Sequence, residues 1–150
     1  MAAAERYTFS SLMSLLIESE RKLKGLYEET LRETDEEKLK LFISEACKQN
    51  AKRVELMQRA RIERVVEMTL EPITDLELTD LITRITNIVE SRNVSNVQKT
   101  MRMEKTISEL YVKVAPKIMG ISSDTGDLIL ALSHESNDRQ KILEQYVKFE

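Results

Sequence analysis

Glycine and proline are scarce in this chain: its 150 residues include three glycines and two prolines. Both residue types are disfavoured in the interior of a helix. Proline lacks an amide hydrogen and clashes with the preceding turn, and glycine loses more backbone conformational entropy on folding than any other residue. Charged residues make up 33% of the sequence, aromatic residues make up 5%, and tryptophan is absent. This composition predicts an all-helical protein built from long helices.

The spacing of apolar residues predicts two long helices in the first half of the chain. Apolar residues recur at every third or fourth position over residues 9–31, as they do on one face of a helix. Thr34 and Glu37 have the spacing of a capping box, which predicts that a second helix starts after a tight turn. That helix is expected to run for roughly 30 residues and to stop before Pro72. The two helices form a predicted hairpin over residues 8–70.

The second half of the chain repeats this arrangement after a connection. Thr74 and Glu77 form another capping-box pattern, which predicts a shorter amphipathic helix over residues 76–91. A second hairpin is expected over residues 94–148, and Gly120 suits the position directly after its first helix.

Inside the second hairpin, Pro116 is expected to kink or shorten the end of the first helix. Asp124 is expected to cap the next helix, which should reach Tyr146. We therefore expect residues 1–150 to form a single domain, an antiparallel four-helix bundle with an extra short helix in its long connection. An up-down bundle with a fifth helix added fits the same pattern.

Two glutamates interrupt the apolar stripes of the predicted helices in the same way. Glu20 and Glu104 each stand seven residues before a tyrosine that follows a leucine, in the segments ERKLKGLYEE and EKTISELYVK. Positions separated by three, four or seven residues share a helix face, so both carboxylates are expected to point into the bundle. Chance explains one such glutamate, because every third residue is charged, but the equal offset in both hairpins argues against it. A buried carboxylate must be protonated, paired with a cation or bound to a metal.

A glutamate seven residues before an aromatic residue, on the first and third long helices, resembles the rubrerythrin branch of the ferritin-like superfamily. The resemblance covers nearly the whole chain as a pattern of hydrophobicity and spacing. It implies a ferritin-like fold, in which one long crossover connection joins two helical hairpins. It also implies a pair of iron ions held by one glutamate from each of these two helices and by a Glu-x-x-His motif on each of the other two.

The other two long helices depart from this ligand pattern. When the sequence is aligned on the hydrophobic residues that precede the family's motif, the two Glu-x-x-His pairs are replaced by Gln49, Lys52, Ser136 and Arg139. Cationic side chains are poor metal ligands, whereas magnesium, manganese and iron sites use carboxylates and imidazoles. The metal site is therefore predicted to be degenerate, and no cofactor is expected.

The cationic replacements suggest another role for the two glutamates. Arg139 and Lys52, or its neighbour Arg53, are expected to stand where metal cations stand in the family. Arginine is well suited to this role because its planar guanidinium can pair with a carboxylate through two hydrogen bonds. We therefore predict a buried charge network at the metal position, made of Glu20, Glu104, Gln49, Lys52, Ser136 and Arg139.

A shifted alignment leaves a carboxylate-rich metal site as the alternative. The only histidine of the chain then lies one helical turn from an aspartate, on the same helix as a further glutamate. The alternative site would bind iron or manganese through Glu20, Glu45, Glu104, His134, Glu135 and Asp138. By analogy with the family, this reading implies oxidase, ferroxidase or metal-storage activity. The competing interpretation is that the histidine and the aspartate form an ordinary exposed pair.

The charge of the chain does not favour nucleic acid or a membrane as a partner. The formal net charge is −3, and the basic run over residues 48–64 includes Glu55 and Glu63 but no aromatic residue. A solvated helix face is therefore favoured over a contact with nucleic acid. The N-terminal sequence lacks the pattern of a signal peptide, and Cys47 is the only cysteine. These features predict a soluble cytoplasmic protein.

Apolar residues cover more than one face of two predicted helices, over residues 12–17 and 65–70. A bundle core uses one stripe of each helix, so the excess must be covered by the connecting helix or by a partner chain. We expect a homo-oligomer, most simply a dimer. No phosphate-binding loop, nucleophile elbow or zinc-ligand spacing is present in the sequence. The predicted function is non-enzymatic, that of a structural or protein-interaction module, and the alternative is the metal-binding protein described above.

Overall fold

The structure, a computed structural model, describes residues 5–63 and 72–147. Its helices are α1 (Phe9–Glu33), α2 (Glu37–Glu63), α3 (Thr79–Glu90), α4 (Asn96–Met119) and α5 (Ser123–Glu144). No strand occurs in these two ranges, where the only extended pairing is an isolated bridge between Tyr7 and Ile73. The prediction of an all-helical fold is confirmed for these residues. None of the described helices is long and apolar enough to cross a lipid bilayer.

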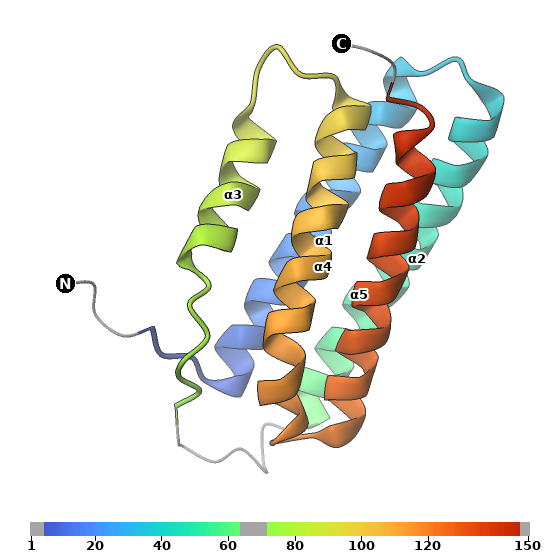
Figure 1. The fold of residues 1–150 in the computed structure, drawn as a ribbon. Helices are drawn as coiled ribbons and strands as arrows, with labels where there is room; N and C mark the ends of the chain where they lie inside the picture. Colours follow the sequence, from blue (N-terminus) through green and yellow to red (C-terminus); the bar gives the residue numbers. More distant parts are fainter. Residues whose placement is uncertain (1–4, 64–71, 148–150) are drawn as a thin grey trace.

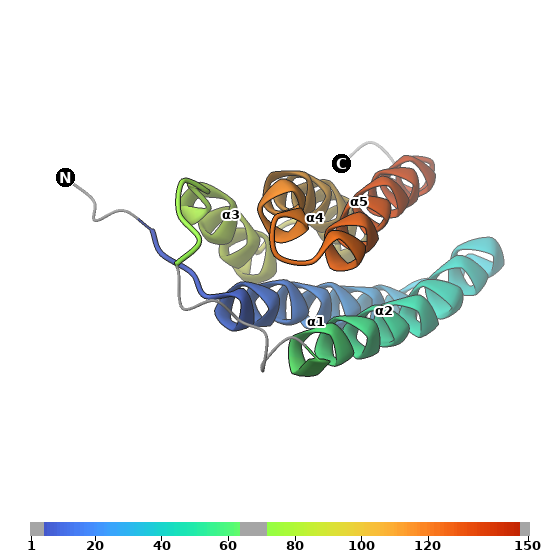
Figure 2. The same ribbon diagram turned by 90° about the horizontal axis from the view of Figure 1, so that it is seen from below.

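The four long helices lie side by side, and the shorter α3 lies next to α4 (Figure 1). In this view the chain ascends in α1, descends in α2, ascends in α3, descends in α4 and ascends in α5. The closest backbone contacts occur between α1 and α2, between α4 and α5, and between α1 and α4. Among the described helices, α2 packs closely only against α1, and Figure 2 shows it at the edge of the molecule.

The described part of the first hairpin contains the two predicted helices but differs from the prediction at its turn. The cap of α1 is Thr8, which exchanges capping hydrogen bonds with Ser11. Thr34 does not form the predicted capping box, because it is the C-terminal cap of α1 and its hydroxyl accepts a hydrogen bond from the amide of Glu36. The second helix starts at Glu37, and its predicted end, including residues 65–70, lies outside the described residues.

The predicted capping box before α3 is wrong. Asp75 and Glu77 adopt left-handed backbone conformations, with φ angles of 64° and 49°. These conformations interrupt a right-handed helix, so α3 starts only at Thr79. The side chains of Leu76 and Leu78, which each follow one of these two residues, are buried and hold this irregular segment against the core.

The second hairpin has the predicted helices with a different cap. Ser122, and not Asp124, caps α5 by accepting a hydrogen bond from the amide of Thr125, and Asp124 lies in the first turn. Pro116 lies inside α4, which continues to Met119 and is not shortened. At the start of α5, a Cβ atom on Gly126 would lie 2.8 Å from the backbone of Met119 at the end of α4, so only glycine permits this close approach.

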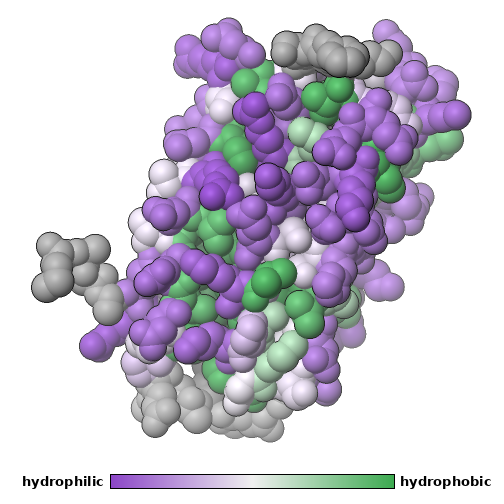
Figure 3. All heavy atoms as spheres, in the orientation of Figure 1, coloured by the Kyte–Doolittle hydropathy of each residue, from purple (hydrophilic) through white to green (hydrophobic). Residues whose placement is uncertain are grey.

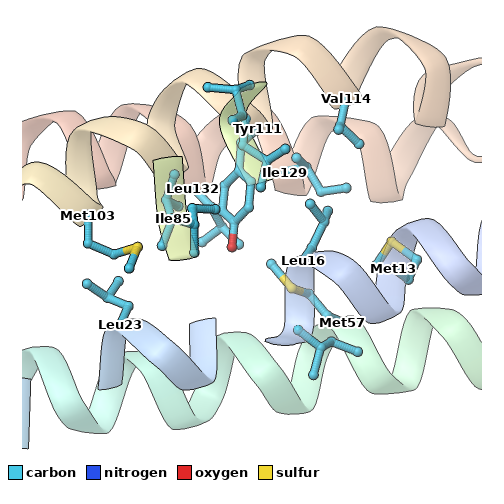
Figure 4. Close-up of a cluster of buried hydrophobic side chains, with 14 of the residues drawn as sticks. Met13, Leu16, Leu23, Met57, Ile85, Met103, Tyr111, Val114, Ile129 and Leu132 are labelled. Atoms are coloured by element: carbon cyan, nitrogen blue, oxygen red, sulfur yellow. The ribbon is translucent and has the colours of Figure 1, made fainter. Parts of the chain in front are cut away.

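The core is formed mainly by aliphatic and methionine side chains from all five helices, and it also includes the aromatic residues Phe9, Tyr27 and Tyr111. Figure 4 shows a cluster of these side chains. Leu12, Met13, Leu16 and Ile17 of α1 are at most 3% exposed. The apolar excess predicted on this helix is therefore covered within the chain. Outside the core, the face seen in Figure 3 is mainly hydrophilic, with small separate hydrophobic areas.

The segment before α1 forms hydrogen bonds with the start of α3 and with the residues that precede it. The carboxylate of Glu5 accepts a hydrogen bond of 2.6 Å from the amide of Leu78 and another from the hydroxyl of Thr79. Tyr7 and Ile73 exchange two backbone hydrogen bonds of 3.0 and 2.6 Å beside it. A carboxylate at the N-terminus of a helix satisfies a free amide and interacts favourably with the helix dipole. Glu5 thus supplies the cap that the local sequence before α3 does not.

Replacing Glu5 with alanine is expected to lower the free energy of unfolding by about 1 kcal/mol, since the cap of α3 is lost. The amide of Leu78 should then exchange its hydrogen faster, which hydrogen exchange read by NMR measures directly. The exposed Glu18 on α1 provides the control substitution Glu18→Ala, which should leave that amide unchanged. Equal exchange rates in the two variants would contradict this account of the cap.

Candidate functional site

Two fully buried glutamates, Glu20 of α1 and Glu104 of α4, lie at the centre of the bundle, and both are 0% exposed. The hydroxyl of Tyr111 donates a hydrogen bond of 2.6 Å to Oε1 of Glu20, and the hydroxyl of Tyr27 donates a short hydrogen bond to Oε2 of Glu104. Each carboxylate is therefore bound by the tyrosine of the other helix. The seven-residue spacing matters because it places a glutamate of one helix level with the tyrosine of its neighbour.

Two buried arginines provide the positive charge. Nη1 of Arg53 on α2 lies 2.9 Å from Oε1 of Glu20, and Nη1 of Arg139 on α5 lies 3.4 Å from Oε2 of Glu104. The side chains of both arginines are at most 4% exposed. A third carboxylate, that of Glu135, lies 3.1 Å from Arg53 and 3.3 Å from Arg139, and its side chain is 43% exposed. Glu135 thus connects the two guanidinium groups on the solvent side.

The arginines also bind polar side chains of the opposite helix. Nη1 of Arg53 donates a hydrogen bond of 3.1 Å to Ser136 on α5, and Nη1 of Arg139 donates one of 2.7 Å to Asn50 on α2. Gln49 accepts a further hydrogen bond from Arg139. Asn50 and Ser136 each precede an arginine by three residues, so the two hairpins present equivalent residues to each other. We call this set the charge network: Glu20, Gln49, Asn50, Arg53, Glu104, Glu135, Ser136 and Arg139.

The predicted network is corrected by one residue on α2. Lys52 is exposed, and the buried cation is its neighbour Arg53. Asn50, and not Gln49, is the residue that corresponds to Ser136, although Gln49 also binds Arg139. Successive helix positions differ by about 100° in direction, so a register error of one residue exchanges an inward side chain for an outward one.

The buried surroundings of Glu104 disfavour the ionised form of its carboxyl. Burial raises the pKa of this carboxyl, while Arg139, Arg53 and the hydrogen bond from Tyr27 act in the opposite direction with less effect. Burial tends to lower the pKa of Arg53, but the neighbouring acidic groups, of which Glu20 and Glu104 contribute most, together outweigh burial, and the pKa is raised. Burial also raises the pKa of both tyrosines, so they remain neutral hydrogen-bond donors.

The charge network does not fit the di-iron centre that the family resemblance implies. The side chains that face the two glutamates from α2 and α5 are the guanidinium groups of Arg53 and Arg139, which are poor metal ligands and already balance the charges of Glu20 and Glu104. One oxygen of each carboxylate, Oε2 of Glu20 and Oε1 of Glu104, accepts no hydrogen bond from the described part of the chain. These two carboxylate oxygens are the ones left open to a cation that competes with the arginines.

The alternative metal ligands are not brought together. Glu45, His134 and Asp138 are exposed, and Glu135 binds the two arginines. Within residues 5–63 and 72–147, no group of three or more histidine, cysteine, aspartate or glutamate side chains has the geometry of a metal site. Cys47 is partly buried, and its pKa is raised by burial, so the thiolate is disfavoured.

Several contacts of the site were not anticipated from the sequence. The pairing of each tyrosine with the glutamate of the other helix was missed, as was the role of Asn50. Thr30 and Thr100, which lie 3.1 Å apart between α1 and α4, were also missed. A signal for the arginines was present, because a small polar residue stands three positions before an arginine in both α2 and α5.

No protein-family model matches the chain, and none of the curated proteins or solved structures compared with it gives a match.

Replacing Arg139 with methionine is expected to lower the free energy of unfolding by about 3–5 kcal/mol, because Glu104 remains buried without its cation. Thermal and denaturant unfolding measure this loss. The double variant Arg139→Met/Glu104→Gln should be more stable than the single variant, since it removes both charges. The exposed Arg92→Met substitution is the control, and a melting temperature of Arg139→Met equal to that of the control would contradict the network.

The raised pKa of Glu104 predicts a pH dependence of stability. The pKa of its carboxyl is higher in the folded than in the unfolded state. The contribution of Glu104 to the free energy of unfolding is therefore fully present below the unfolded pKa and is lost over the interval in which the pH rises through the folded pKa. The wild-type protein should therefore lose stability relative to Glu104→Gln as the pH rises through this interval. Denaturant unfolding at a series of pH values tests this; a difference between the two proteins that stays constant with pH would refute it.

Proposed function

We propose that this chain is a ferritin-like antiparallel four-helix bundle that functions without a metal, as a structural or protein-interaction module. In this proposal α3 lies in the crossover between the hairpins, and the charge network holds the position that metal ions hold in the family. The observation that carries the proposal is the pairing of two buried glutamates with two buried arginines. Protein cations neutralise the carboxylates, so the site needs no metal for charge balance.

The inaccessibility of the site supports a non-enzymatic role. Glu20, Glu104, Tyr27 and Tyr111 are all 0% exposed, and each is bound to another member of this group. A substrate would have to displace these hydrogen bonds and separate packed helices to reach either carboxylate. Glu135, whose side chain is partly exposed, is itself paired with both arginines.

The second candidate is a divergent metal-binding protein with oxidase, ferroxidase or metal-storage activity. It is favoured by one observation, the unpaired oxygens of Glu20 and Glu104. In that case a cation would share the site with Arg53 and Arg139, and binding would be opposed by two positive charges.

Self-association stays a prediction, and the residues that support it lie on α2 and not on α1. The apolar residues of α1 are covered within the chain, whereas Leu41 and Ile62 of α2 are 72% and 70% exposed. The exposed apolar residues of α2 are therefore the ones that support it. Contact with nucleic acid through residues 48–64 is opposed by the exposed Glu55 and by the burial of Arg53.

Metal content separates the two candidates. The purified protein is incubated with ferrous iron, manganese or zinc, freed of loosely bound ions and subjected to elemental analysis. We expect no stoichiometric metal, because the arginines hold the place of the cations. One or two ions per folded chain, lost on replacement of Glu20 or Glu104 with glutamine, would instead support the metal-binding protein.

A further inference from the structure

Several buried polar atoms of the charge network form no hydrogen bond with the described part of the chain. They are Oε2 of Glu20, Oε1 of Glu104, Nδ2 of Asn50, and Nε and Nη2 of Arg53. All four residues are at most 2% exposed. Nη2 of Arg53 lies 3.1 Å from the carboxylate of Glu135 and so has a partner in charge. The other atoms are buried donors and acceptors that require a partner, because burial has removed their hydrogen bonds with bulk water.

These atoms belong to groups that already meet at the two arginines. Nη1 of Arg139 donates hydrogen bonds to Oδ1 of Asn50 and to Oε2 of Glu104, at 2.7 and 3.4 Å. The free nitrogen of Asn50 and the free oxygen of Glu104 are therefore the second atoms of two groups bound at one nitrogen. In the same way, Nη1 of Arg53 lies 2.9 Å from Oε1 of Glu20, whose other oxygen is free. The free atoms thus surround the centre of the charge network.

The chemistry of these atoms restricts what could bind them. The two oxygens are acceptors, whereas the amide nitrogen of Asn50 and the guanidinium nitrogen of Arg53 are donors. A metal cation would suit the oxygens but would be repelled by two guanidinium groups, and an anion would suit the donors but would be repelled by two carboxylates. A small neutral molecule that both donates and accepts hydrogen bonds suits both sets. Water has these properties, and buried water typically bonds to polar groups that have no other partner.

We propose that the charge network contains a buried water site. One or more water molecules donate hydrogen bonds to Oε2 of Glu20 and Oε1 of Glu104 and accept hydrogen bonds from Nδ2 of Asn50 and Nε of Arg53. The inference rests on the proposed metal-free state of this site and names the ligand that occupies it. Because Glu20 lies on α1 and Glu104 lies on α4, water that bridges them adds a contact between the two hairpins.

The groove between α2 and α5 gives the water a route to solvent. Gln49, Glu135 and Arg139 line this groove and belong to the charge network. The side chain of Glu135 is 43% exposed, so the groove reaches solvent at this carboxylate. Water can therefore exchange along the groove without separating α1 from α4, whose backbones are in close contact. We expect the bound water to exchange more slowly than surface water.

The first test is a crystal structure of the metal-free, full-length chain at a resolution that shows ordered water. At least one water molecule is expected within hydrogen-bonding distance of a free carboxylate oxygen of Glu20 or Glu104 and of Nδ2 of Asn50 or Nε of Arg53. Oxygen-17 relaxation dispersion tests the same point in solution, because it detects long-lived water. It reports whole water molecules, so exchanging hydroxyl protons of the tyrosines make no contribution.

The substitution Glu104→Gln distinguishes water from a cation. The amide oxygen of glutamine still accepts the hydrogen bonds of Tyr27 and Arg139, so its NH2 group takes the place of the free oxygen. Water can accept a hydrogen bond from this NH2 group as well as it donates one to the oxygen, whereas a cation loses its ligand. The dispersion amplitude of Glu104→Gln should therefore equal that of Glu18→Gln, the matched control at an exposed position of α1.

The outcomes separate the water site from the proposed function. A crystal structure without water at these atoms, or the absence of long-lived water in solution, would overturn the water site, and elemental analysis would still decide the metal-free role. Stoichiometric metal would overturn the proposed function, and the water site is then judged on the chain freed of metal by a chelator. An amplitude lost in Glu104→Gln but kept in Glu18→Gln, with both variants folded by circular dichroism, would overturn water as the ligand.

Discussion

The structure depends on neutralising two carboxylates that lie where a helical bundle normally places apolar side chains. Burial of Glu20 and Glu104 removes both from water, and neither keeps any exposed surface. Each is held by one arginine and one tyrosine, which together supply a positive charge and a neutral hydrogen-bond donor. A bundle with such a centre needs its helices in one register, because a shift would leave a charge buried and unpaired.

The charge network also explains how α2 and α5 are joined although their backbones are not in close contact. Long side chains span the distance: Arg53 reaches Ser136, and Arg139 reaches Asn50. Apolar side chains alone would have to bring the two helices closer to exclude water. The backbones of α1 and α4 are therefore in close contact, whereas α2 and α5 are joined by polar side chains.

The sequence was sufficient to predict the helices and the two glutamates, because both follow from helical spacing. It was insufficient for the register of α2, because the hydrophobic residues on which the alignment was based include Leu41, which is 72% exposed. Lys52 and Arg53 are adjacent cations, and only the packing of the whole bundle decides which of them faces inward. The start of α3 was missed for a related reason, since its cap is Glu5, which lies 73 positions before Leu78 in the chain.

The division of the ion pairs between the hairpins has a consequence for assembly. Glu20 and Arg53 belong to the first hairpin, and Glu104 and Arg139 belong to the second. Each hairpin thus contains its own pair of opposite charges. When the two hairpins dock during folding, they bury ion pairs and not single charges. The hydrogen bonds of the two tyrosines with the glutamates, and that of Arg139 with Asn50, join different hairpins and form only after docking. They therefore stabilise the correct alignment of the two hairpins over any other.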